Sequence, residues 1–314
     1  MSFLSNISRL VQDPPPQFVF ELSEAGIAYA RGGQPGFEPL EPGVLKPSPV
    51  DDNLPHPEKA AALLGQIAAL DASGKIDASG KWGASGTAGS AGKTKSKVRR
   101  AAVILPDHAA RVSVLDFDVF PSAVAEQLAL VRFRVKKTVP FDIESAAVSY
   151  FPQPVEGAGK RVEVVAVTVA LEVLARYEAL FRGAGFHPGE ITTSGLAALN
   201  LYPDTSARGG GPGVVAKLAG HVLTVMVIAK GRLRLFRCLA LEEASVEEVR
   251  AVLHPTFAYA EDELGTRVER LTVCGFSHLP PLDLGLNDLR LRSRLGTAEA
   301  FNAGLLGYLE ANVN

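Results

Sequence analysis

Hydrophobic and polar residues follow two different periods along the chain, which together predict a mixed α/β fold. The segment "FVFELSEAGIAYA" (18–30) alternates as a strand does and has Glu-Ala-Gly at its centre, so it is predicted to be a β-hairpin. Three successive apolar runs in 213–241 are separated by turns at Gly220 and Gly231 and predict a second antiparallel meander. The alternation in "RLRLFR" (232–237) is expected of a half-exposed strand with its cations in solvent.

Helical periodicity appears between these strands. Ser122 is the expected N-cap of a helix over 122–139, and Ser245 with Glu248 forms a predicted capping box at the start of a long helix. Further helices are expected over 58–70, 174–185 and 297–313.

The segment 71–97 consists almost entirely of small and polar residues and contains "DASGK" twice, which predicts a flexible linker. Within it, Gly92-Lys93-Thr94 matches the end of a phosphate-binding P-loop. The first glycine of that motif would fall on residue 87, which is a threonine, and a strand rather than a helix is predicted to follow. We therefore expect no nucleotide site here.

The N-terminal segment 1–17 carries one apolar helical face. This face consists of Phe3, Leu4, Ile7, Leu10 and Val11. A short helix packed on its own domain and a helix that docks on a membrane surface or a partner are both compatible with this pattern.

The composition of the chain argues against several classes of function. The chain has 314 residues, which favours two lobes, and a formal charge of -2, so nucleic acid is not an expected partner. Cys238 and Cys274 are expected to be reduced thiols. The six histidines show no metal-ligand spacing, and the Gly-x-Ser-x-Gly motif of hydrolases is missing from the sequence.

Three segments carry a resemblance to a known family: "VILPDHAARVSVLDFDVFP", "FRVKKTVPFDIESAAVSYF" and "RYEALFRGAGFHPGEITTSGLAALNLY". With the order of predicted elements, they make the chain similar to PilM-type proteins of type IV pilus assembly, which are akin to the cytoplasmic part of type II secretion scaffolds. The resemblance implies a two-lobed actin-like fold, which is a duplicated ribonuclease H-like fold. The expected parts are a first lobe over 18–187, containing a linker insert (71–99) and an inserted subdomain (107–170), and a second lobe over 188–314.

The resemblance also indicates where ATP and magnesium would bind. Two hairpin turns that normally read Asp-x-Gly would hold the phosphates; here Glu21 and Ser23 stand in the first turn, and Lys217 and Ala219 in the second. On the adenosine side only Gly275 remains of a glycine-rich loop. Loss of nucleotide binding is the expectation, with no cofactor and no catalytic or metal-binding residue. Weak ATP binding, with Lys217 acting as a phosphate cation, is the alternative.

The implied function is that of a cytoplasmic scaffold at the inner face of the inner membrane, in contact with other pilus platform and motor components. It would bind the N-terminal cytoplasmic peptide of a PilN-like bitopic membrane protein and act as a pseudo-ATPase. The predicted contact residues are Arg134, Lys136, Lys137 and Phe141, although "RFRVKK" is also compatible with a solvated helix face. An active ATPase of the same fold and a sugar-kinase-like enzyme are the rivals.

Overall fold

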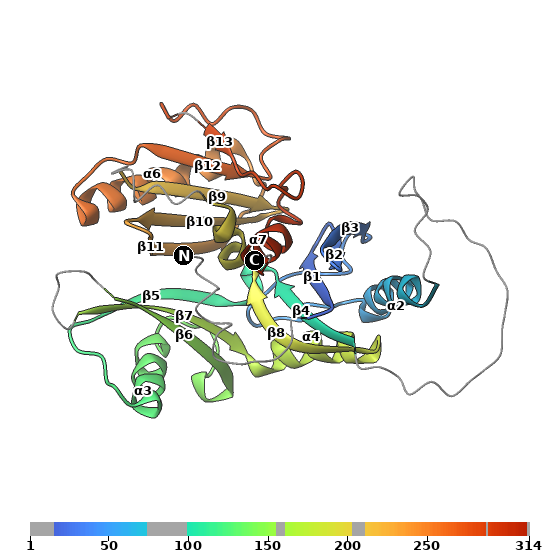
Figure 1. Cartoon of the computed structure of the whole chain (residues 1–314). Helices are drawn as coiled ribbons and strands as arrows, with labels where there is room; N and C mark the ends of the chain where they lie inside the picture. The colour runs from blue at the N-terminus through green and yellow to red at the C-terminus, as the bar shows by residue number, and fades with distance from the viewer. Residues whose placement is uncertain (1–15, 74–98, 155–160, 203–210, 287, 313–314) are drawn as a thin grey trace.

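The computed structural model describes residues 16–73, 99–154, 161–202, 211–286 and 288–312 (Figure 1). It contains two five-stranded sheets and one three-stranded sheet, with helices packed around them. The predicted N-terminal helical face and most of the linker insert lie outside the described residues. No helix among the residues described is long and apolar enough to cross a membrane.

The first sheet has the strand order β3-β2-β1-β4-β8. Its strands are β1 (Phe18–Ser23), β2 (Gly26–Arg31), β3 (Gln34–Pro39), β4 (Arg99–Leu105) and β8 (Phe186–Thr193). The first three form an antiparallel meander, and β4 and β8 continue the sheet in parallel with β1. The lobe boundary expected between residues 187 and 188 falls inside β8. Since β8 pairs with β4 along its whole length, the first sheet extends to Thr193.

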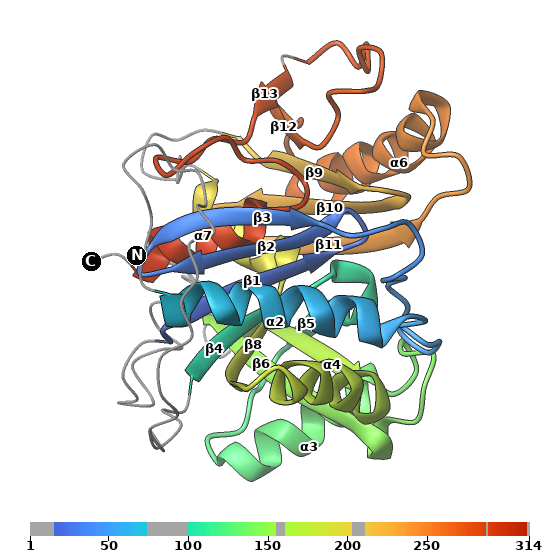
Figure 2. The same ribbon diagram turned by 90° about the vertical axis from the view of Figure 1, so that its right-hand side faces the viewer.

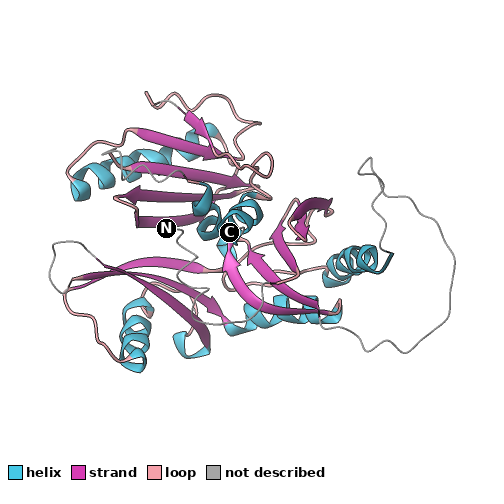
Figure 3. Ribbon diagram, in the orientation of Figure 1, coloured by secondary structure: helices cyan, strands magenta, loops and turns pink. Residues whose placement is uncertain are grey.

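The second sheet repeats this arrangement in the order β11-β10-β9-β12-β13. Its strands are β9 (Gly213–Ala219), β10 (Val222–Ala229), β11 (Arg232–Ala240), β12 (Arg270–Cys274) and β13 (Asp288–Arg290). The predicted meander forms β9 to β11, and β12 and β13 are parallel to β9. Figure 3 shows the two meanders and the smaller sheet as magenta arrows.

The inserted subdomain (residues 107–170) contains the third sheet, in the order β5-β7-β6. Its elements after the short turn η1 (Asp107–Ala109) are β5 (Arg111–Phe117), α3 (Val124–Val135), η2 (Ile143–Ser145), β6 (Ala146–Pro154) and β7 (Val162–Ala170). Helix α3 is shorter than predicted, and its N-cap is Ala123 without a side-chain hydrogen bond, so the assignment of Ser122 as the cap was wrong. Lys136 and Lys137 therefore follow the helix instead of ending it.

Helices cover both faces of the first sheet, which explains why β1 is buried along its length. Helices α2 (Pro57–Ser73) and α4 (Leu171–Gly183) pack on one face (Figure 2). On the other lie the helix α5 (Ser194–Ala198), the turn η3 (Leu199–Leu201) and α7 (Ala303–Asn312). Apolar residues of α5 and α7 also contact the second sheet, so these two helices form a layer between the sheets.

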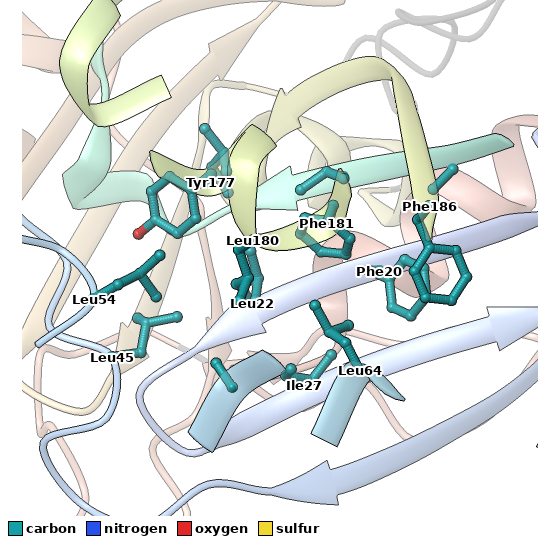
Figure 4. Packing of buried hydrophobic residues seen from close by; sticks show 14 of the residues in the cluster. Phe20, Leu22, Ile27, Leu45, Leu54, Leu64, Tyr177, Leu180, Phe181 and Phe186 are labelled. Carbon is teal, nitrogen blue, oxygen red and sulfur yellow. The ribbon is translucent and has the colours of Figure 1, made fainter. Parts of the chain in front are cut away.

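The core under α2 and α4 is rich in aromatic rings (Figure 4). Phe20 of β1 lies edge-on to Phe186 of β8, with ring centroids 4.8 Å apart, and Phe181 of α4 lies 5.2 Å from Phe20. On the second lobe, α6 (Val246–Leu264) covers the outer face of the sheet and begins at the predicted capping box of Ser245. The two cores fix the backbone of β1 and β9, which carry the residues of the candidate site.

Candidate functional site

Glu21 and Lys217 occupy equivalent places in the two duplicated meanders. Each lies two residues before the last pair of its hairpin, which is Ser23 with Gly26 in the first sheet and Ala219 with Val222 in the second. Both strands are buried, and both side chains point into the layer between the sheets, where they line one cavity. The structure thus brings together the two positions that the sequence selected.

Asp107 is the centre of the buried polar contacts between the lobes, and sequence reasoning did not select it. It follows β4 of the first lobe, and its Oδ2 lies 3.0 Å from Lys217 Nζ and accepts a hydrogen bond from Thr224 Oγ1 at 2.9 Å. Its Oδ1 accepts a hydrogen bond from the backbone N–H of Gly195 at 2.6 Å. All four residues come from different elements, so this carboxylate connects β9 and β10 of one lobe to β4 and α5.

Glu21 makes a second set of contacts in the same layer. Its Oε2 accepts a hydrogen bond from the N–H of Leu305 at 2.7 Å, in the first turn of α7, and its Oε1 accepts one from the Ser194 hydroxyl. Burial raises the pKa of Glu21, and the nearby Lys217 opposes that rise. The sequence alone does not show that Lys217, far away along the chain, lies beside Glu21.

Lys217 remains a cation although it is buried. Burial alone would lower its pKa, but the negative charges of Asp107 and Glu21 outweigh that effect, and the pKa lies above its ordinary value. The ammonium is therefore engaged by carboxylates of the protein itself.

The two hairpin turns touch each other above this layer. Ser23 is used within its own turn, where its hydroxyl donates to the carbonyl of Gly26 at 3.0 Å. A Cβ on Gly220, next to Ala219, would lie 2.5 Å from the carboxylate of Glu24, so the second turn packs directly on the first. The cavity that remains between them has a volume of about 20 Å³, which is room for about one water molecule.

The loop expected on the adenosine side, which contains Gly275, is also tightly packed. Gly275 follows β12 with a φ of 83°, a conformation that favours glycine. A Cβ at this position would lie 2.1 Å from the carbonyl oxygen of Leu218 and 2.6 Å from Ala300 Cβ. The loop therefore packs tightly against β9 and against the segment that leads into α7.

The arginines of "RLRLFR" do not simply point into solvent as the alternation predicted. Arg232 lies 3.0 Å from the buried carboxylate of Glu163 in β7, and Arg234 forms a hydrogen bond with the same carboxylate. Gln153 of β6 accepts a hydrogen bond from the N–H of Leu233 and donates one to its carbonyl, both at 3.0 Å. β11 is thus a contact between the second lobe and the inserted subdomain, whereas the sequence pattern alone indicated a solvent-facing strand.

The predicted partner-binding residues are spread over different environments. Lys136 and Lys137 are exposed, and Arg134 is exposed with its guanidinium 5.1 Å from the ring of Phe117. Phe141 is half-buried and packs on the core of the inserted subdomain. Phe133, which was not selected, has 72% of its surface exposed.

Comparison with solved structures places the fold. One chain of a PilM-PilN type IV pilus biogenesis complex matches with a TM-score of 0.66 and 15% sequence identity, covering 96% of this chain and 100% of that one. The protein has the two-lobed actin-like fold. The cytoplasmic domain of EpsL, an inner-membrane component of the type II secretion system of Vibrio cholerae, matches with a TM-score of 0.50 and 12% identity over 95% and 96% of the two chains.

No protein-family model matches the sequence, and neither does any curated protein. The resemblance to PilM in fold was predicted from the sequence and is confirmed by these structures. At such low identity the likeness concerns the fold, and the chemistry of the cleft has to be judged from the residues themselves.

Those residues do not fit ATP and magnesium in the arrangement described. The cation and the carboxylates of the cleft bind one another, and the remaining cavity is far smaller than the roughly 300 Å³ or more typical of a small-molecule site. Among the described residues there is no group of three or more histidine, cysteine, aspartate or glutamate side chains that could hold a metal ion. A sugar kinase would need an aspartate in the cleft, and Asp107 does lie there, but both of its oxygens are engaged.

Proposed function

We propose that this protein is a scaffold of a type IV pilus or type II secretion assembly platform and acts by binding, without ATP hydrolysis. The observation that carries the proposal is the likeness to the PilM-PilN chain over 96% of this chain and 100% of that one. The EpsL cytoplasmic domain, which also belongs to an inner-membrane assembly system, supports the same class of function. Because one matching structure is from a type IV pilus and the other from a type II secretion system, the proposal includes both systems.

The cleft supports binding over catalysis. An actin-like ATPase needs acceptors and a metal at the two turns, whereas here Lys217 stands in one turn and is already paired with Asp107. The hydrogen bonds from Gly195 and Leu305, which could otherwise face an anion, go to protein carboxylates. An enzyme that used this cleft would first have to break these contacts.

The proposed partner is the cytoplasmic N-terminal peptide of a PilN-like single-span membrane protein. The inserted subdomain offers an exposed surface for it next to the end of α3, where Phe133, Lys136 and Lys137 are all accessible. An aromatic anchor beside two cations suits a peptide that carries an apolar residue and acidic residues. Phe141 supports this surface from the core of the inserted subdomain.

Fluorescence anisotropy with a labelled peptide tests the proposal. The peptide is the cytoplasmic N-terminus of a PilN-like single-span membrane protein, and saturable binding in the micromolar range is expected. Replacing Phe133 by Ala should weaken binding at least about tenfold, since exposed aromatic anchors dominate such contacts. Leu289→Ala is the matched control, because Leu289 is an exposed apolar residue on the second lobe. Saturable binding with unchanged affinity in Phe133→Ala would exclude this surface as the binding site. No binding at millimolar peptide would exclude the proposed partner.

A further inference from the structure

Three buried ionisable side chains meet in the layer between the sheets. Glu21, Asp107 and Lys217 have 1%, 3% and 3% of their surfaces exposed. Two of them belong to the first lobe and one to the second, and Lys217 Nζ lies 3.0 Å from Asp107 Oδ2 across the boundary. A buried charge is tolerated only when it is paired and hydrogen-bonded, so each of these groups depends on the others being in place.

The same carboxylates hold the helices between the sheets. Asp107 accepts the N–H of Gly195 in the first turn of α5, and Glu21 accepts the N–H of Leu305 in the first turn of α7. Thr224 adds a hydroxyl from β10 to Asp107. Both sheets and both helices of the intervening layer are therefore connected through one cluster.

A second contact fastens the lobes from the side of the inserted subdomain. The chain enters this subdomain from β4 and leaves it into α4, so it is covalently part of the first lobe, yet β5 contacts β11 of the second lobe (Figure 1). Glu163 with Arg232 and Arg234, and Gln153 with the backbone of Leu233, provide its polar contacts. An apolar cluster lies between the two parts, formed by Val165, Leu196, Val215, Met226, Leu233 and Phe236.

We propose that Lys217 is an internal counter-ion that allows the two lobes to stay closed, so that the closed form of this actin-like fold needs no ligand in its cleft. The apolar cluster and the Glu163 contact stabilise closure, and the pairing of Lys217 with Asp107 allows it by neutralising charge that closure buries. Without the ammonium, Asp107 and Glu21 would be two acidic groups buried together, and opening the lobes to water would allow both of them to ionise. This inference rests on the cleft and is independent of the proposed peptide partner.

Lys217→Met tests the proposal in the full chain, by small-angle X-ray scattering and by amide hydrogen exchange. The variant should have a larger radius of gyration than the wild type. Exchange should accelerate at least about tenfold at Gly195 and in peptides from β9 and β10, while peptides from α6 keep their protection. Lys59→Met is the matched control, because Lys59 pairs with Glu41 on the surface, and it should behave as the wild type does.

Two further variants keep the test decisive. Asp107→Asn combined with Lys217→Met removes both charges and should return exchange at Gly195 part of the way to the wild-type rate. Thr224→Val removes only one hydrogen bond to Asp107 and decides the matter if Lys217→Met does not fold; it should accelerate exchange at Gly195 by a smaller factor. Wild-type scattering and exchange in Lys217→Met would overturn the proposal, as would wild-type exchange at Gly195 in Thr224→Val or a wild-type protein that contracts only when ATP and magnesium are added.

Discussion

The crossing of α5 and α7 sets the geometry of the cleft, and Gly307→Ala tests it. A Cβ on Gly307 would lie 2.2 Å from the carbonyl oxygen of Ala197 and 3.1 Å from the Cα of Ala198. Both neighbours are backbone atoms of α5, so they cannot rotate away. The added methyl group must push the two helices apart, and with them the N–H groups that Glu21 and Asp107 accept.

Two effects oppose each other in this variant. Alanine favours a helix over glycine by about 1 kcal/mol, and overpacking a tight contact costs about 1–3 kcal/mol or more. Since the clash is with backbone, we expect the upper part of that range and a net loss of about 2 kcal/mol. With an unfolding entropy of about 2.1 cal/mol/K per residue, a chain of 314 residues should then show a fall in Tm of about 3 °C.

Gly65→Ala is the matched control, because it is the same substitution in a helix that has no close backbone contact at this position. Gly65 lies on the exposed side of α2, and a Cβ there would meet nothing within 4 Å. This variant should gain about 0.5–1 kcal/mol. Differential scanning calorimetry of both variants gives the answer. Shifts in Tm of equal size and sign in the two variants would refute the argument that α5 and α7 cross in close backbone contact.

Two further predictions concern other buried groups. Glu163→Gln should lower the free energy of unfolding in urea by about 1–3 kcal/mol, because it leaves Arg232 and Arg234 without a counter-charge. Asp116→Asn is the control and should change this free energy little, because Asp116 pairs with Arg161 on the surface. Equal losses of stability in the two variants would contradict this reasoning. Burial raises the pKa of Cys238 and of Cys274 to about 12, so at pH 8 about one thiol in ten thousand is ionised. Iodoacetamide should therefore modify the native protein about three orders of magnitude more slowly than the urea-unfolded chain, as followed by mass spectrometry, and rapid native labelling of either cysteine would disprove it.

Local sequence patterns predicted much of the fold for identifiable reasons. The hairpin over 18–30, the second meander and the capping box of Ser245 depend on neighbouring residues, and all three occur in the structure. The start of α3 was misplaced because its N-cap is Ala123 and does not use the hydroxyl that the sequence offers at Ser122. The boundary near residue 188 was misplaced because membership of β8 in the first sheet is decided by its pairing with β4.

The candidate site was predictable only in part. The resemblance to PilM-type proteins pointed to one position in each hairpin and so selected Glu21 and Lys217, and their place in buried strands marks them as unusual. Asp107 was not selected, although the "LPDH" sequence puts an acidic residue at the end of a buried strand, which was the available signal. Its partners Gly195 and Thr224 lie 88 and 117 residues away, and no local pattern reports contacts of that range.

Isothermal titration of the purified protein with ATP and magnesium tests the central claim most directly. If Lys217, Asp107 and Glu21 engage one another in the cleft, no saturable binding should appear at ATP concentrations up to about 1 mM. Binding in the micromolar range, or turnover of ATP above that of the buffer alone, would contradict the account.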